Sequence, residues 1–586
     1  MLKKAVLFAM LSYGVPVLAQ TTFLPLGSED YHNMDRLETR SGRLCDSIAS
    51  SDKPETRKNA VYFMETIRAN AAKNGNGLSN IDRYNLDQMI SESGEWTPKG
   101  DGAINSKHPW FNTFYKKQYD FVNVHTDDFM FDNNFFLVIN PVTDNTVTIQ
   151  HNTPQPSGVS NRVLYSSRGA ELRGWISKKV GFYTSITDNQ EQFPYYVYGN
   201  VDKKLQAVPG ADYFLKPATK YGTYDYMQAT GYVNFDIVKN HINTTFGFGK
   251  HFIGDGISSL FLTDNSSSMP YLQIQTRIWK LNYECLFLEL TPQYNNDTGD
   301  QVLSHKFSTI HYLTANVTKW LNIGLFEAEV FDRPDNYEIS YLNPIIFSTA
   351  INRFNGAGDK SLLGFSAKAI AAKHVQLYTQ VVLNEFRYTE LVHDKGWYGN
   401  KYGLQLGAKY FDAFTIKNLD LQGELDAVRP YTYTAQDTLA NYTNYNQPLA
   451  DPLGAGFVKV IGMIKYQPCR NLYLTAKATY YIQGVDTGGM NYGSDVFDSY
   501  HSAAHIYGVS MINGPKSSCQ ILSLNASYEL RRNLFLDLGG VYRKYTNTAG
   551  AYPDYSTTGT ALGPLSTSYV YFGFRVNAPR REYDFF

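Results

Sequence analysis

The sequence predicts an all-β membrane protein: an antiparallel transmembrane β-barrel preceded by a small α-helical domain. Three observations predict it: the composition, the polar–apolar alternation of many segments, and the alternation of short turns with long loops. Aromatic residues make up 15% of the chain, although only 18% is charged and the mean hydropathy is −0.34. This mixture suits a barrel, because half of each strand faces lipid, the other half faces a wet lumen, and aromatic girdles lie at both interfaces.

The first twenty residues have the pattern of an export signal. Lys3 and Lys4 precede an apolar run over 5–18, and small residues lead to a cleavage site that we place after Ala19. Gln20 stands where a lipid-anchored chain has Cys, so no lipid anchor is expected here. No later stretch approaches ~20 consecutive apolar residues, the length of a membrane-spanning helix.

A helical domain should follow the signal peptide. The clearest of three helical patterns covers 54–72, and its apolar face comprises Ala60, Val61, Met64, Ile67 and Ala71. Ser79 and Asp82 form a capping-box pattern that opens a third helix. After Trp96 the period changes to that of strands. We therefore expect a signal peptide over 1–19, a periplasmic helical domain over 20–98, a connecting segment or extra strands over 99–143, and an outer-membrane barrel over 144–586.

The strand pattern has a period of two, which gives each strand two different faces. In 420–426, the polar face comprises Asp420, Gln422, Glu424 and Asp426, and Leu425 lies on the apolar face. A β-sandwich would explain any one such strand, so the connections decide. Short turns are expected at 177–179, 239–241, 279–280, 318–320, 371–374, 413–415, 468–470 and 531–532. Long loops are expected at 189–225, 251–270, 293–306, 332–360, 388–400, 430–455, 484–517 and 547–565. Short periplasmic turns and long external loops are typical of outer-membrane barrels.

The same alternation predicts the number of strands. Eight short turns join sixteen strands, and a terminal strand over 569–577 is the seventeenth. Both ends should be periplasmic, so the number is even, and 145–151 supplies the eighteenth strand. Segment 133–140 either raises the number to twenty or lies against the barrel mouth. A terminal aromatic residue such as Phe586 is a barrel-insertion signal, and it supports the prediction of a barrel.

Six segments carry a resemblance to a known family: 168–194, 247–272, 341–347, 418–434, 441–457 and 461–468. They resemble the Wzi-type capsule-assembly outer-membrane proteins, especially the branch with the gliding-motility protein RemB. The resemblance extends from about residue 165 to the C-terminus. It implies an eighteen-stranded barrel with a periplasmic helical bundle and a non-enzymatic role in holding or organising surface polysaccharide. The gliding branch implies a surface role in adhesion or motility.

Two sets of loop residues are candidates for glycan binding. Lys250, His251 and Asp255 either bind polar sugar groups or tie their loop into the barrel mouth. The second set comprises Arg429, Tyr431, Tyr433, Tyr442, Asn444 and Tyr445. Tyrosine rings stack on sugars and amides bond their hydroxyls, but such residues also make adaptable contact surfaces. The alternative is therefore that this loop folds inward as a plug.

We find no sequence pattern for catalysis, a metal site or a cofactor. Glu327 and Glu329 share a strand face, as do Glu424 and Asp426, so paired acids for glycoside hydrolysis are conceivable. We prefer to place these four charges in a wet lumen. No GxSxG or HExxH motif is present, and the four cysteines show no CxxC spacing.

The expected function is binding or organising surface polysaccharide at the cell exterior, without enzymatic activity. The alternatives are a gliding-motility or secretion scaffold that docks outer-membrane or motility proteins, and a porin-like diffusion channel. Outer-membrane lipid is an expected partner. The net charge of −1 argues against a nucleic-acid partner, which needs a strongly basic face.

Overall fold

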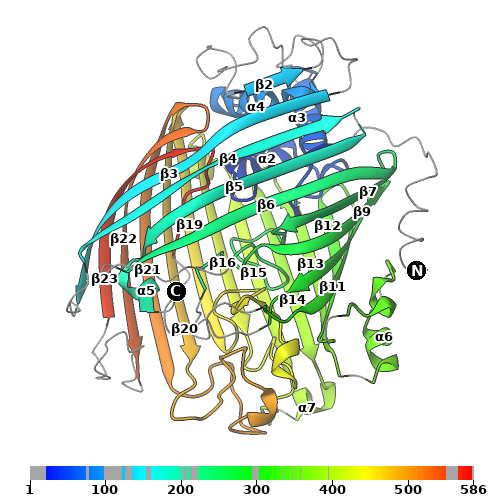
Figure 1. Cartoon of the computed structure of the whole chain (residues 1–586), viewed down its shortest axis with the longest axis vertical. Helices are drawn as coiled ribbons and strands as arrows, with labels where there is room; N and C mark the ends of the chain where they lie inside the picture. The colour runs from blue at the N-terminus through cyan, green and yellow to red at the C-terminus, as the bar shows by residue number, and fades with distance from the viewer. Residues whose placement is uncertain are drawn as a thin grey trace.

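A closed barrel dominates the fold, with helices α2, α3 and α4 gathered at one end (Figure 1). The computed structural model describes residues 21–73, 78–97, 122–125, 135–153, 160–177, 179–199, 201, 207–211, 222–292, 302–333, 336–345, 348–356, 358–393, 395–548 and 565–583. The expected signal peptide over 1–19 and the terminal Phe586 lie outside these residues.

Eighteen antiparallel strands close the barrel within the described ranges, and β23 pairs with β3 to complete the ring. They are β3 (Phe135–Thr153), β4 (Arg162–Ile176), β5 (Val180–Gln192), β6 (Thr223–Val238), β7 (Ile242–Gly249), β9 (Met269–Ile278), β10 (Leu281–Leu290), β11 (Lys306–Asn316), β12 (Leu321–Phe331), β13 (Lys360–Ala371), β14 (Val375–Glu385), β15 (Lys401–Tyr410), β16 (Leu419–Val428), β19 (Phe457–Cys469), β20 (Leu472–Gly484), β21 (Lys516–Arg531), β22 (Leu534–Asn547) and β23 (Leu565–Val576).

The prediction of eighteen strands is confirmed, and the length of β3 excludes the alternative of twenty strands. β3 is one continuous strand of 19 residues. It contains the described part of 133–140, the segment considered as an extra strand. β3 pairs with β4 from Phe135 onward and with β23 from Thr143 onward. The barrel therefore begins before the boundary expected at 144.

Short turns join the strands in pairs at one end of the barrel, and long connections join them at the other. The turns fall where they were expected, although the one between β15 and β16 is longer and contains a 3-10 turn, η7 (Ala413–Thr415). Positive φ angles at Ser177 (54°), Asn240 (60°) and Trp279 (55°) reverse the chain tightly. Such left-handed residues match the twist of the flanking strands.

The N-terminal domain comprises α2 (Glu29–Ser41), α3 (Arg57–Lys73), α4 (Asn80–Glu92) and a 3-10 turn, η1 (Gly94–Trp96). Its core includes Met34, Phe63 and Leu86. The expected capping box is present: the hydroxyl of Ser79 accepts from the backbone N–H of Asp82 at 2.9 Å, and the Asp82 carboxylate accepts from that of Ser79 at 2.8 Å. In the described ranges, no helix combines the length and the apolar character needed to cross a membrane.

The other short elements lie in connections. They are β1 (Asp52–Lys53), β2 (Val122–His125), β8 (Phe252–Ile253), β17 (Thr443–Asn444), β18 (Gln447–Pro448), α5 (Tyr195–Gly199), α6 (Ser348–Phe354), α7 (Tyr388–Val392), η6 (Ile339–Leu342), η8 (Thr438–Ala440) and η9 (Tyr500–Ser502).

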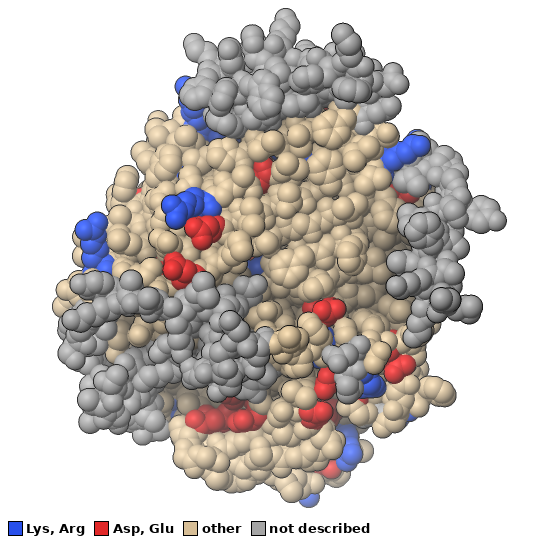
Figure 2. Space-filling model, viewed as in Figure 1, with Lys and Arg blue, Asp and Glu red and all other residues tan. Residues whose placement is uncertain are grey.

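The outer face of the barrel carries a band of exposed apolar side chains. Leu406, Leu425, Val460, Val570 and Phe572 belong to it, with exposed fractions from 37% to 58%. Figure 2 shows few charged residues across the middle of the wall on the side in view. An exposed apolar band around a closed barrel is the surface that meets lipid.

Candidate functional site: the barrel lumen

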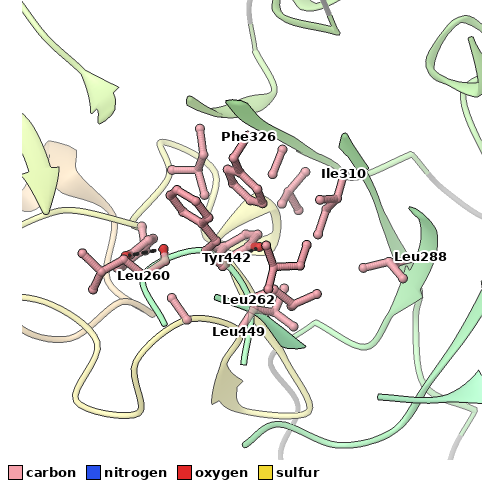
Figure 3. Packing of buried hydrophobic residues seen from close by; sticks show 14 of the residues in the cluster. Leu260, Leu262, Leu288, Ile310, Phe326, Tyr442 and Leu449 are labelled. Carbon is pink, nitrogen blue, oxygen red and sulfur yellow. Dashed lines mark hydrogen bonds between the residues drawn. The ribbon is translucent and has the colours of Figure 1, made fainter. Parts of the chain in front are cut away.

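Two loops fold into the lumen. The first connects β7 to β9, and its Phe261 stacks on Phe326 of β12 at 4.4 Å between ring centres. The second connects β16 to β19, and its Tyr442 and Leu449 lie in the same apolar cluster (Figure 3). Because strands on several sides of the barrel contact these loops, the loops occupy the interior.

Three tyrosines proposed for glycan stacking are buried, and two of them, Tyr433 and Tyr442, lie in this packing. Tyr433 donates its hydroxyl to the carbonyl of Leu260 at 2.8 Å, and Tyr442 donates to that of Phe261 at 2.8 Å. Tyr431 is also fully buried. Rings covered in this way have no face free for a sugar. For these residues, the structure favours the inward-folded plug.

The rest of the second candidate set also bonds internally. The Asn444 side chain accepts from the backbone N–H of Thr291 at 3.0 Å, and the backbone N–H of Tyr445 donates to the carbonyl of Thr291 at 3.1 Å. The Tyr445 side chain is only half-buried. Arg429 donates to the carbonyl of Val509 at 3.1 Å, which links two long connections.

Lys250 and Asp255 tie the first loop in place. Lys250 Nζ donates to the carbonyl of Asp264 at 3.0 Å. The Asp255 carboxylate accepts from the Ser51 hydroxyl at 2.7 Å and lies 3.3 Å from Lys368 Nζ. These contacts match the structural alternative for this set, in which the residues hold the loop.

His251 is buried without a hydrogen-bond partner at either ring nitrogen among the described residues. Its Nδ1 lies 3.8 Å from Glu284 Oε1, and its ring packs edge-on against Tyr271 at 4.4 Å. Burial lowers the pKa of His251 to about 3, because the charged ring would lose its hydration.

Glu424 and Asp426 face the lumen, as the strand alternation predicts. Glu424 accepts from the backbone N–H of Ser258 at 3.0 Å and from the hydroxyl of Tyr378 at 2.8 Å. Asp426 accepts from the Ser258 hydroxyl at 2.7 Å and lies 3.1 Å from Lys459 Nζ. The two acids therefore anchor the first loop from the β16 wall.

Glu327 and Glu329 do not face the lumen, which corrects the expectation for this pair. On β12, Phe326 points inward onto Phe261, and its neighbour Leu325 is 48% exposed on the outer face. With a period of two, Glu327 and Glu329 share the outer face with Leu325. They are nevertheless buried.

The helical domain closes the short-turn end of the lumen from inside. Arg36 of α2 donates to Asp412 in the β15–β16 connection and to Asp420 of β16. Lys409 Nζ of β15 lies 2.6 Å from the carboxylate of Asp35. The strand β1, which precedes α3, pairs with β8 of the first lumen loop. The N-terminal segment thus meets an inward-folded loop within the barrel.

The C-terminal tail also returns to the lumen after β23 ends. Arg581 donates to the carbonyl of Pro209 at 2.8 Å, and the Tyr196 hydroxyl donates to the carbonyl of Tyr583 at 2.9 Å. Glu582 lies 3.1 Å from Lys477 Nζ of β20. The described end of the chain therefore packs inside the barrel instead of extending the last strand.

A cavity of about 720 Å³ remains between this tail, residues 23–29 and the inner wall of β3–β7 and β19–β23. Eight tyrosines line it: Tyr165, Tyr183, Tyr232, Tyr271, Tyr481, Tyr569, Tyr571 and Tyr583. Hydroxyl and amide side chains such as Thr475 and Asn525 lie between them. The sequence analysis missed this site, although the alternation along β23 places Tyr569 and Tyr571 on one face.

The cations around the cavity have acidic partners or carbonyl contacts. Lys465 lies 2.7 Å from Glu29, and Arg581 lies 3.5 Å from Glu191. Lys459 pairs with Asp451 in the second loop. Since charges of both signs neutralise each other, the wall offers mainly aromatic faces and neutral hydrogen-bonding groups.

The fold and the lumen define the class of protein: an outer-membrane-type β-barrel whose interior is partly filled by its own chain. Among solved structures, it is similar to Wzi, described as an outer-membrane protein involved in group 1 capsule assembly in Escherichia coli and as a carbohydrate-binding β-barrel. The identity is 12%, the TM-score is 0.52, and the match covers 94% of this chain and 99% of that one.

A second match is OprD of Pseudomonas aeruginosa, with 10% identity, a TM-score of 0.39, and coverage of 75% of this chain and 95% of that one. No family model and no curated protein matches the chain. At these identities the likeness to Wzi shows the fold alone. The capsule-assembly family and its gliding-motility branch therefore stay predictions from the resemblance.

Proposed function

We propose that this protein is a non-enzymatic outer-membrane barrel that binds surface polysaccharide in its tyrosine-lined cavity. The observation that carries the proposal is the chemistry of the cavity wall, where aromatic rings alternate with hydroxyls and amides and the charges are paired. Aromatic faces stack on sugar rings, and neutral donors and acceptors bond their hydroxyls. The volume lies in the range of ordinary ligand sites.

The fold likeness to a carbohydrate-binding barrel supports the same ligand class. We further propose that the ligand is capsular, that the long loops face the cell exterior and that the helical domain faces the periplasm. A diffusion channel is the less favoured alternative, because apolar loops fill one side of the lumen and the helical domain packs into its short-turn end.

The test is a binding titration of surface polysaccharide fragments against the purified barrel in nanodiscs. Stacking on an aromatic contributes ~1–3 kcal/mol in nucleic-acid platforms, so the double change Tyr165→Ala and Tyr571→Ala should weaken binding by about tenfold or more. The matched control is Tyr542→Ala, because this tyrosine is 46% exposed on the outer face of β22.

Tyr542→Ala should leave the affinity unchanged. Heat-modifiable migration on gels shows whether each variant is folded. A folded double variant with the affinity of the unaltered protein would remove the cavity as the polysaccharide site.

A further inference from the structure

A segment of the β12–β13 connection lies on the outside of the barrel wall. We call its described residues, 336–345 and 348–356, the wall segment; it contains η6 and α6, and Figure 1 shows α6 outside the strands. Tyr341 is fully buried and stacks on Phe331 at 4.6 Å, and the hydroxyls of Tyr337 and Thr309 lie 2.5 Å apart. Phe331 and Thr309 both belong to the outer face of their strands.

The wall segment supplies hydrogen-bond donors to the two outward carboxylates. Glu327 accepts from the backbone N–H of Thr349 at 2.8 Å and from its hydroxyl at 2.9 Å. Glu329 accepts from the amide of Asn352 at 3.2 Å. A carboxylate on the lipid-facing side of a barrel needs such partners, because the hydrocarbon layer offers none.

The strand register gives the depth of this contact. Leu363 of β13 is the direct neighbour of Glu327 and is itself 46% exposed. Leu325, two residues before Glu327, is 48% exposed on the same face. The wall segment therefore lies beside side chains of the apolar band that meets lipid.

The exposed side chains of the wall segment include four large apolar ones, beside Asn336, Asn343 and Arg353. Ile339 is 75% exposed, Leu342 41%, Ile345 64% and Phe354 88%. With Leu325 and Leu363 on the adjoining strands, they continue the apolar surface of the barrel outward. These apolar side chains fit hydrocarbon better than water, and the long Arg353 side chain beside Phe354 extends its charge toward the headgroups.

We propose that the wall segment is embedded in the membrane and that its exposed apolar side chains contact lipid acyl chains. One side of the segment covers Glu327 and Glu329, and the other side presents apolar side chains to the lipid. The inference is independent of polysaccharide binding, which takes place inside the barrel. It also explains how two acids persist on the outer face of β12.

A fluorescence experiment tests the depth. In a chain whose four free cysteines, Cys45, Cys285, Cys469 and Cys519, are replaced by alanine, Phe354→Cys is labelled with an environment-sensitive dye. The protein is placed in vesicles that contain phospholipid with nitroxide-labelled acyl chains. Leu425→Cys on the barrel wall is the lipid control, and Tyr507→Cys, 50% exposed in the β20–β21 connection, is the water control.

The label at 354 should emit at a shorter wavelength than the label at 507 and be quenched by the nitroxide lipid as strongly as the label at 425. Emission and quenching like those at 507 would overturn the proposal. So would a blue shift without nitroxide quenching that disappears on dilution in lipid, since a second copy of the chain would then cover this surface. If the Phe354→Cys chain does not fold, Ile345→Cys provides the same comparison.

Discussion

The two halves of the lumen differ although the same kind of strand builds both. Beside β9–β16, inward side chains such as Leu288, Ile310 and Phe326 pack against loops of the protein itself. Beside β3–β7 and β19–β23, inward residues such as Glu171 and Tyr571 border the open cavity. We call these the filled half and the open half. In the filled half, apolar side chains and inward acids such as Glu424 hold the protein's own loops, whereas in the open half a tyrosine-rich polar face borders the remaining space.

The largest expected effect contrasts a buried ring in the filled half with one in the open half. Tyr442→Ala should reduce the free energy of unfolding by ~3–5 kcal/mol, because a fully buried aromatic leaves a void. Tyr571→Ala should cost clearly less, since water fills the space beside its half-buried ring. Urea unfolding in lipid vesicles measures both; equal losses would mean that the halves are packed alike.

A second prediction is that lipid covers the outer wall of both halves, so that an arginine costs about the same on either. Leu425 lies on the outer wall of the filled half and Phe572 on that of the open half, with exposed fractions of 37% and 54%. Arg at either position should cost ~2–4 kcal/mol near the bilayer midplane. The same unfolding measurement checks it. A large cost at only one of the two would show that protein, not lipid, covers the other.

A smaller effect is expected from the lumen acids. Glu424→Gln should destabilise the protein by ~1–3 kcal/mol, because the amide cannot accept all the bonds that the first loop donates to this carboxylate. Glu171→Gln in the open half should cost less, since among the described residues Glu171 accepts hydrogen bonds from Asn140 and Tyr183 alone. Proteolysis at the first loop in the Glu424 variant, absent from the Glu171 variant, is the readout.

The smallest effect at neutral pH is expected at His251. Its neutral ring has no hydrogen-bond partner among the described residues, so His251→Leu should change stability by less than ~1 kcal/mol at pH 7. The pKa of His251 is lowered from 6.5 to about 3, so the ring carries no protonation penalty above pH 6.5. As the pH falls from 6.5 toward 3, the fold loses stability, because the unfolded chain binds a proton that the buried ring does not. The unaltered protein should therefore lose more stability between pH 7 and pH 4 than the variant. Equal pH dependence would contradict this.

The sequence predicted the barrel well because strand alternation and turn length are local properties. The eight turns, the eighteen strands and the capping box at Ser79 follow from short stretches of chain. Which face of a strand points into the lumen does not follow from a short stretch of chain. Around Glu327, apolar residues occur on both faces of β12. The sequence therefore predicts Glu327 and Glu329 in a wet lumen, whereas the β12–β13 connection covers them on the outside of the barrel.

The loop residues show a second limit. Tyr442 and Tyr431 belong to a loop with the composition of a sugar-binding loop. Their exposure, however, depends on contacts with distant segments, such as that of Tyr442 with Phe261. The cavity is equally non-local, because the C-terminal tail that borders it is placed by contacts with Pro209 and Lys477. Only the tertiary structure therefore shows which residues form the buried plug and which line the open cavity.

The central claim is that the lumen holds a binding cavity obstructed by the protein's own loops and helical domain, and that it is not a diffusion channel. Recording ionic current after insertion of the purified barrel into a planar bilayer tests it most directly. With the helical domain and the loops in the lumen, insertion verified by fluorescence should be followed by no stable conductance steps. Stable open-channel steps in the unaltered protein would contradict the account and restore the porin-like alternative.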